Sequence, residues 1–329
     1  MIRTIFFQPG KPLQTGLDPA TLSRTLRNRR GLLWLDFESE DPEVCQPILE
    51  SFGFHPLSIE DALQQSHSPK IDDWGEYVYL VINYMHINGH EKSAWDTEVD
   101  ELDIFLGPNY VVTHHDHPVP AIESVRANCQ RDPRYLQDGA DHLLYKIIDY
   151  VVANYMPIVE RIDEEIDEIE DQVFDRPTPQ TLEKIFTLKR ALLSMRRILL
   201  PQREVLNKLS RDDYSVVDRK DRIFFRDIYD HLVRLQDLNE TMRDLVSGAL
   251  DTYLSVVNNR MNEVMKTLTI ITTLFMPLTF VTGFFGMNFF AANPPYDGWT
   301  APLSFYVTLG LIALTPFFMY LWMRRRTWV

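Results

Sequence analysis

The pattern of apolar and polar positions changes twice along the chain. Residues 1–140 alternate helix-like segments with short apolar segments that are typical of strands. These strand-like segments are Ile2–Phe7, Gly31–Phe37, Tyr77–Met85, Leu102–Leu106 and Tyr110–Thr113. The turn sequence Gly107-Pro108-Asn109 predicts a hairpin between the last two, and Ser58 is a candidate cap for a short helix. The pattern predicts a mixed α/β domain over residues 1–140.

From residue 141 onward the apolar spacing becomes that of long helices. In Tyr155–Val173, apolar residues recur every three or four positions and acids fill the gaps, which is typical of an amphipathic helix. The prolines of Arg176–Pro179 break this helix. The basic segment Leu182–Leu200 predicts a second helix that ends at Pro201. An acidic helix followed by a basic one predicts an antiparallel hairpin.

A very long helix is predicted after this hairpin. No proline occurs between Gln202 and Pro277, and a polar turn near Ser210 precedes the helical pattern. At 1.5 Å per residue, a helix from Val217 to Phe285 is about 100 Å long. Such a stalk must pack against the hairpin or against copies of itself, and it enters the apolar C-terminal region without a break.

Two uncharged runs near the C-terminus predict two membrane spans. No charged residue occurs from Thr267 to Tyr296, and after Asp297 none occurs before Arg324. Each run contains the roughly 20 residues with which a helix crosses a bilayer. The expected divisions are 1–140 (α/β domain), 141–264 (hairpin and stalk), 265–288 (first span), 289–301 (loop), 302–323 (second span) and 324–329 (basic tail). The fold class is therefore an α+β membrane protein.

Charge predicts the orientation of these spans in the cell membrane. The N-terminal sequence has no apolar core long enough for a signal peptide. Lys266 and Arg324 to Arg326 lie on one side of the two spans, so the positive-inside rule places both termini in the cytoplasm and the loop outside.

The distribution of charge and cysteine excludes some partners. Of 33 bases and 47 acids, four bases and one acid lie beyond residue 264. The remaining 29 bases and 46 acids give residues 1–264 a net charge of −17, which argues against nucleic acid and suits small cations. Cys45 and Cys129 form no CxxC motif, which fits a reduced compartment without a zinc cluster.

One face of the first predicted span carries small or mildly polar residues, which we call the stripe. Its members, spaced by three or four positions, are Asn262, Met265, Leu268, Thr272, Met276, Thr279 and Gly283. Taken alone, the stripe fits a helix–helix contact as well as the lining of a pore. The long stalk favours a pore, and because one helix cannot enclose a hole, the lining requires a symmetric ring of subunits.

The chain resembles the CorA family of magnesium and cobalt transporters. The residues that carry the resemblance are Gly286-Met287-Asn288, Asn262–Lys266, Phe275–Phe280, Phe225–His231, Ser247–Asp251 and the basic C-terminus with Trp328. The resemblance implies a homopentameric channel in the lipid bilayer, with a funnel-shaped cytoplasmic domain. The first span would line the pore and the second would surround it.

The resemblance also implies roles for individual residues. Mg²⁺ holds its water tightly, so the oxygens of Gly286-Met287-Asn288 would select a hydrated ion at the outer mouth. The family gate falls on Met265 and Leu268, where apolar side chains can exclude water, with an ion position near Asn262.

Regulatory metal binding is implied for Asp227 and Asp251. Asn88 occupies a position where an acid is expected to partner Asp227, so that site would be weaker or relocated to neighbours such as Asp230 or His231. Mg²⁺ would be both substrate and regulatory ligand, Co²⁺ or Ni²⁺ could also pass, and no cofactor is implied.

Three histidines and an acid follow one predicted strand and raise a second possibility. His114, His115, Asp116 and His117 offer ligands for zinc or nickel, although so tight a cluster is more typical of a solvated turn. A zinc transporter of the same superfamily is the alternative within transport, and a membrane-anchored oligomeric scaffold or signalling protein is the alternative of another class. No P-loop, GxSxG, HExxH or dinucleotide motif points to an enzyme.

Overall fold

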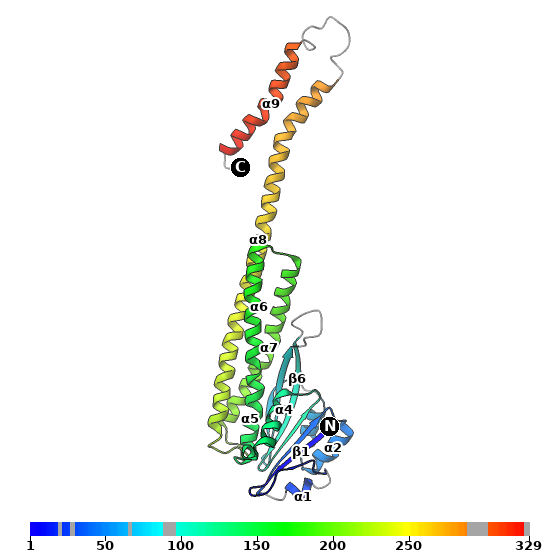
Figure 1. Ribbon diagram of the computed structural model, residues 1–329, viewed down its shortest axis with the longest axis vertical. Helices are drawn as coiled ribbons and strands as arrows, with labels where there is room; N and C mark the ends of the chain where they lie inside the picture. Colours follow the sequence, from blue (N-terminus) through cyan, green and yellow to red (C-terminus); the bar gives the residue numbers. More distant parts are fainter. Residues whose placement is uncertain (19–21, 27–29, 65–67, 88–96, 288–301, 326–329) are drawn as a thin grey trace. The chain divides into compact units, whose positions relative to one another are not determined.

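The chain folds into two units, Met1–Asp251 and Thr252–Val329. The structure is a computed structural model (Figure 1) that describes residues 1–18, 22–26, 30–64, 68–87, 97–287 and 302–325. Asn88 and Asn288, two of the predicted site residues, lie outside the described residues.

A mixed sheet forms the centre of the first unit. Its seven strands lie in the order β2-β1-β3-β7-β6-β5-β4, and β3 pairs with β7 in parallel. The strands are β1 (Ile2–Phe7), β2 (Gln14–Thr15), β3 (Leu32–Glu38), β4 (Lys70–Asp73), β5 (Val78–Ile87), β6 (Thr97–Gly107) and β7 (Tyr110–His115). All five predicted strands are confirmed, and the predicted hairpin closes with Gly107 opposite Tyr110.

Helices cover both faces of this sheet because its strands are apolar on both sides. The helices beside the sheet are α1 (Leu22–Leu26), α2 (Pro42–Ser51), α3 (Pro56–Leu63), α4 (Pro120–Arg131) and α5 (Ala140–Ala153), with the 3₁₀ turn η2 (Pro133–Leu136) between the last two. Leu49 of α2 and Ile59 of α3 pack with Leu35 and Phe105 of the sheet. Arg126 of α4 lies 3.7 Å from Asp36 on the other face.

The predicted serine cap of α3 is wrong. The helix begins at Pro56, and His55 is the capping residue, because its Nδ1 accepts the N–H of Leu57 at 3.2 Å. The Ser58 hydroxyl instead donates to the His55 carbonyl at 2.9 Å. Pro56 suits the first helical position, since proline has no N–H to satisfy there.

The acidic and basic helices form the predicted antiparallel hairpin (Figure 1). They are α6 (Tyr155–Asp175) and α7 (Pro179–Arg211), and the apolar seam of α6 is buried. Lys184 of α7 lies 3.1 Å from Glu165 and 4.0 Å from Glu168 of α6. Thr178 and Thr181 form a capping box that starts α7 directly after the turn.

The predicted end of the basic helix at Pro201 is wrong. Helix α7 continues through this proline to Arg211, although proline removes one backbone hydrogen bond from a helix. Burial stabilises the helical turn that follows Pro201. Gln202 and Leu206 are fully buried, and the Gln202 amide oxygen accepts the N–H of Asn83 at 3.2 Å. Packing on the sheet therefore outweighs the local preference of Pro201.

Helix α8 (Arg222–Gly286) is the predicted long helix, and it continues from the first unit into the second. It begins at Arg222 rather than at the predicted Val217. The Asp221 carbonyl accepts the first helical N–H groups, those of Phe224 and Phe225. In the first unit, Asn239 of α8 donates to the Leu192 carbonyl of α7 at 3.2 Å.

The second unit contains the end of α8 and helix α9 (Pro302–Arg325). Both helices are long and apolar enough to cross a membrane, and their most apolar stretches are 0% and 6% buried by the rest of the chain. The prediction of two apolar C-terminal helices is confirmed, whereas the finer divisions at 140, 264, 288, 301 and 323 stay predictions.

Candidate ion pathway and cation sites

The stripe lies on an uncovered face of α8. All seven of its positions are exposed, with Met265 and Leu268 each 56% exposed and Met276 68% exposed. The described residues of the chain leave such an apolar side chain uncovered. The stripe is therefore available to lipid or to other subunits.

The opposite face of the same helix is partly covered. The half-buried residues between positions 270 and 283 are Ile270, Thr273, Leu274, Pro277, Leu278 and Val281. At about 100° per residue, this face points roughly 155° away from the stripe, and Ile271, Phe275 and Phe280, outside the stripe, are exposed as well. Helix α8 thus separates a face that packs within the chain from a face that does not.

The two threonines of the stripe turn their hydroxyl hydrogens inward. Thr272 donates to the Leu268 carbonyl at 2.9 Å, and Thr279 donates to the Phe275 carbonyl at 2.9 Å. A hydroxyl that donates within its own helix still has free lone pairs on its oxygen. Both residues therefore present hydrogen-bond acceptors on the stripe.

The Gly286-Met287-Asn288 motif begins where α8 ends. Gly286 is the last residue of the helix, and the N–H of Met287 donates to the Phe284 carbonyl at 3.3 Å. Among the described residues, and apart from the helix's own backbone and the adjoining residues, no atom lies within 4 Å of the place where a Cβ would stand on Gly283 or Gly286. The described part of the chain therefore leaves space at both glycines.

Asp227 and Asp251 are exposed carboxylates on α8. Asp227 is close enough to Asp149 of α5 for its charge to contribute, after burial, to raising the pKa of Asp149. Burial is the largest cause of that raised pKa, and Lys146 and His231 oppose it. The structure thus offers Asp149 as a neighbour of Asp227 in the same chain.

The sequence pattern did not single out Asp149. It lines a cavity of about 270 Å³ with His231, Arg234 and Leu235 of α8. Asp149 lies in the polar gaps of a helical segment, where an acid is unremarkable, and it is about 80 residues from its neighbours on α8. Because Asp149 and Asp227 are far apart in sequence, no local pattern indicated that they are neighbours.

The histidine cluster is divided between the two faces of the sheet. His114 and His115 are consecutive residues of β7 and are 5% and 1% exposed, so the predicted solvated turn is wrong for both. His114 lies 3.6 Å from Asp103, and His115 lies 3.2 Å from Asp36. Successive side chains of a strand point to opposite faces, so these two rings do not converge on one ion.

The other two members of the cluster are exposed. Asp116 follows β7, and His117 lies 2.9 Å from Asp100 of β6. Among the described residues, one group of three carboxylate, histidine or cysteine ligands converges within 4.8 Å, and it contains none of these histidines. Metal binding by His114, His115, Asp116 and His117 stays a prediction.

Asp103 is a buried acid that the sequence pattern missed. Burial raises its pKa to about 7, although His114 at 3.6 Å and the Tyr79 hydroxyl act against this shift. The Tyr79 hydroxyl donates to Asp103 at 2.5 Å. On the opposite face, burial acts to lower the pKa of His115, but the hydrogen bond and charge of Asp36 outweigh it and raise that pKa. These pairs bind the strands to one another.

Taken together, the fold and the stripe define a membrane protein in which a sheet-containing unit is followed by two apolar helices. The profile of the CorA-like Mg²⁺ transporter protein family matches residues 29–325. The chain belongs to this family, whose members are divalent cation transporters rather than enzymes.

Individual relatives agree with this assignment. The cobalt/magnesium transport protein CorA of Thermotoga maritima is 37% identical over 288 residues, which cover 87% of this chain and 80% of that protein. The protein of the same name from Methanocaldococcus jannaschii is 27% identical over 305 residues and covers 91% of this chain and 92% of its own. The complete structure of the CorA magnesium transporter from M. jannaschii has a TM-score of 0.81 at 22% identity, covering 99% of this chain and 98% of that one.

Proposed function

We propose that this protein is a magnesium uptake channel that also admits cobalt and nickel. The observation that carries the proposal is the position of the stripe, which lies uncovered on α8, opposite the half-buried face, and leads to Gly286-Met287-Asn288. A face that only anchored the helix in lipid would gain nothing from threonine, glycine and asparagine.

Five copies of α8 surround the ion path, with α9 on the outside. One helix cannot enclose a pore, so the stripe works only in a closed ring of subunits. The number five comes from the resemblance to the CorA family. Both termini lie in the cytoplasm and residues 289–301 lie outside, as the basic residues that flank the spans indicate.

The channel passes magnesium with its water retained. Waters bound to a cation point their hydrogens outward and therefore need acceptors. Asn288 and the Gly286 carbonyl supply such acceptors at the outer mouth, and the back-bonded hydroxyls of Thr279 and Thr272 continue them along the stripe. A ring of neutral oxygens holds the ion weakly enough for it to leave.

Met265 and Leu268 close the channel by forming an apolar constriction, and Asn262 holds an ion beside it. Intracellular magnesium keeps this gate closed through carboxylates, among them Asp227, Asp251 and the neighbouring Asp149. The membrane potential drives entry, because a divalent cation gains about 4.6 kcal/mol per 100 mV.

Flux into liposomes tests the choice of ion. Purified protein in liposomes is expected to carry magnesium when an inside-negative potential is imposed, with cobalt and nickel also entering. Zinc flux that depends on a proton gradient, with no magnesium flux, would assign the protein to zinc transport instead.

Replacing Asn288 tests the selectivity ring. Asn288→Ala is expected to abolish magnesium flux without changing the size of the oligomer. Asn293→Ala removes another asparagine of the same loop and should leave flux near that of the unmodified protein. Full flux through an assembled Asn288→Ala channel would contradict the proposed role.

A further inference from the structure

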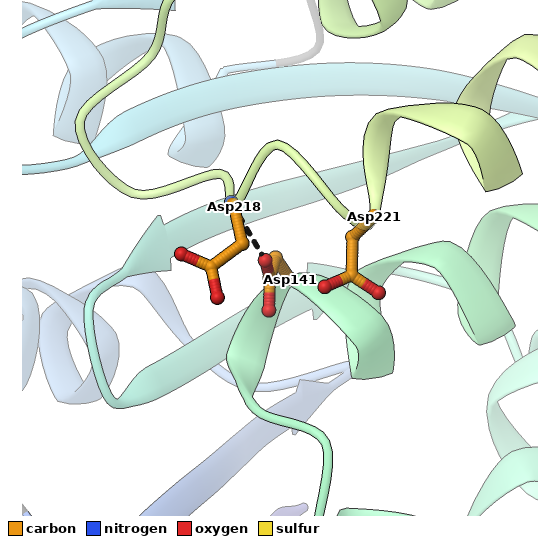
Figure 2. A group of neighbouring side chains, drawn as sticks. All are labelled: Asp141, Asp218 and Asp221. Atoms are coloured by element: carbon orange, nitrogen blue, oxygen red, sulfur yellow. Dashed lines mark hydrogen bonds between the residues drawn. The ribbon is translucent and has the colours of Figure 1, made fainter.

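Three carboxylates meet at the first turn of α5, outside the stripe. Asp141 belongs to α5, whereas Asp218 and Asp221 belong to the segment that leads into α8. One oxygen of each carboxylate lies within 4.8 Å of the others. Figure 2 shows the three carboxyl groups in a row, with Asp141 between the other two.

Backbone hydrogen bonds fix this arrangement. The Asp218 N–H donates to Asp141 Oδ2 at 2.9 Å, and the His142 N–H donates to Asp141 Oδ1 at 3.0 Å. The Asp221 N–H donates to the Asp218 carbonyl at 3.0 Å. The turn before α8 is therefore folded onto the start of α5, and the carboxylates are held together by the fold.

One oxygen of this cluster lacks a donor although it is buried. Asp221 is 2% exposed, and its Oδ1 lies 3.1 Å from His142 Nδ1. Its Oδ2 accepts no hydrogen bond, and Lys220 Nζ, at 3.7 Å on a side chain that is 62% exposed, is beyond hydrogen-bond distance. Lys220 Nζ also lies 3.7 Å from Asp218, so its charge is shared between the two carboxylates. A buried anionic oxygen that accepts no hydrogen bond is costly, and an exposed lysine at 3.7 Å offsets only part of that cost.

The crowding of charge has the same implication. The oxygens of three carboxylates lie within 4.8 Å of one another, where like charges repel, and the two backbone N–H groups that Asp141 accepts carry no full positive charge. The positive ends of α5 and α8 account for acids at positions 141 and 221. They account neither for the third carboxylate, Asp218, nor for the buried oxygen of Asp221 that accepts no hydrogen bond.

We propose that Asp141, Asp218 and Asp221 bind one hard divalent cation, Mg²⁺ or Ca²⁺. These ions take oxygen ligands, at about 2.0–2.1 Å for Mg²⁺ and about 2.3–2.6 Å for Ca²⁺, so oxygens on opposite sides of the ion are about 4–5 Å apart. The 4.8 Å limit on the three carboxylates matches that span. Because α8 begins at Arg222, the bound ion ties the start of this helix to the start of α5.

Hydrogen exchange in the full-length protein tests the site. Amides in peptides covering residues 139–144 and 216–224 are expected to exchange more slowly as Mg²⁺ or Ca²⁺ is added, each ion alone. The ion that protects at the lower concentration is the better ligand. Peptides around Asp227 report the regulatory site proposed above, so failure of one site is distinguishable from failure of the other.

Asp218→Asn is the decisive variant because Asp218 is exposed and its backbone contacts are kept. Removing one charged ligand is expected to raise the cation concentration for half-protection by about tenfold, since ligand charge sets affinity at such sites. Asp138→Asn removes an exposed acid near His142 but outside the cluster, and should shift that concentration less than about twofold. Lack of cation-dependent protection, or equal values for Asp218→Asn and the unmodified protein, would overturn the proposal.

Lys220→Met separates a cation site from an internal ion pair. If a cation occupies the cluster, Lys220 competes with it, and the variant should reach half-protection at a lower concentration. If Lys220 is the real partner, both peptides should exchange faster in the variant at every cation concentration. The second result would also overturn the proposal.

Discussion

Apolar side chains are buried in the first part of α8 and exposed in its second part. In the first unit, Phe225, Ile228 and Leu232 are fully buried by the chain itself. In the second unit, Leu268 and Met276 are 56% and 68% exposed. The same helix therefore contributes to folding at one end and offers an uncovered surface at the other. Substitutions in the first part should change stability, and substitutions in the second should change flux.

The largest effect is expected for Phe225→Ala. Deleting a fully buried phenylalanine costs about 3–5 kcal/mol, because contacts are lost and a cavity remains. The buried thiols of Cys45 and Cys129 report opening of the first unit, so their rate of labelling should rise at least about a hundredfold.

Met276→Ala is the matched change in the uncovered part of the helix. It should leave the labelling of both cysteines within about threefold of the unmodified protein, since no packed core is disturbed. Equal labelling of the two variants would mean that the buried start of α8 does not stabilise the first unit.

The second prediction concerns pH and the buried Asp103. Its pKa of about 7 in the folded protein is above the ordinary value of 3.8, so between these pH values the folded state binds the proton more tightly. The contribution to stability is full below about pH 4 and is lost as pH rises through 7. Asp103→Asn stays neutral and can still accept the Tyr79 hydroxyl. Its stability relative to the unmodified protein should rise by about 2 kcal/mol between pH 5.5 and 8.

Urea unfolding of the full-length protein in detergent measures this change. Asp116→Asn removes an exposed acid just after β7 and should show no comparable rise. A constant difference between Asp103→Asn and the unmodified protein from pH 5.5 to 8 would contradict a raised pKa at Asp103.

Sequence reasoning succeeded where one local pattern decided the outcome. The apolar runs predicted five strands, and the three-to-four spacing of Tyr155–Val173 predicted a seam that is buried. Sequence reasoning failed at Pro201. The local signal predicts that the helix ends there, but the helix continues because Gln202 is buried against the sheet. Tertiary contacts of this kind have no signature in a single stretch of sequence.

The candidate site also contains residues that a local pattern predicted and residues that it missed. The stripe could be read from spacing on one helix, and its residues are exposed in the chain, while its role as a pore lining stays a prediction. The neighbours Asp149 and Asp227 come from different helices, and Asp103 meets His114 across two strands. Such pairs depend on topology, so sequence spacing alone could not reveal them.

The third prediction tests the uncovered face by loosening the proposed constriction. Leu268→Gly is expected to increase magnesium flux at high intracellular magnesium by about tenfold, equivalent to about 1.4 kcal/mol. Ile271→Gly is the control, because Ile271 is 48% exposed but lies outside the stripe. Both changes weaken the helix by a similar amount, roughly 0.5–1 kcal/mol. An equal rise in both variants would assign the leak to a weakened helix and remove Leu268 from the gate.

The smallest effect is expected at the acidic and basic hairpin. Lys184 bridges Glu165 and Glu168, but its side chain is 41% exposed, and such pairs contribute at most about 1 kcal/mol. Lys184→Met should therefore speed amide exchange in α6 less than about fivefold. The difference should shrink further in high salt, which screens exposed charges.

Lys189→Met is the control for this prediction, since Lys189 forms no ion pair with the described residues. If amide exchange in α6 is about equally fast in Lys184→Met and Lys189→Met, the buried apolar seam holds α6 and α7 together, and the complementary charges add little. A loss above about 2 kcal/mol for Lys184→Met alone would exceed what a partly exposed pair supplies. It would mean that the charges of Lys184 and its acidic partners, and not the buried apolar seam alone, hold α6 against α7.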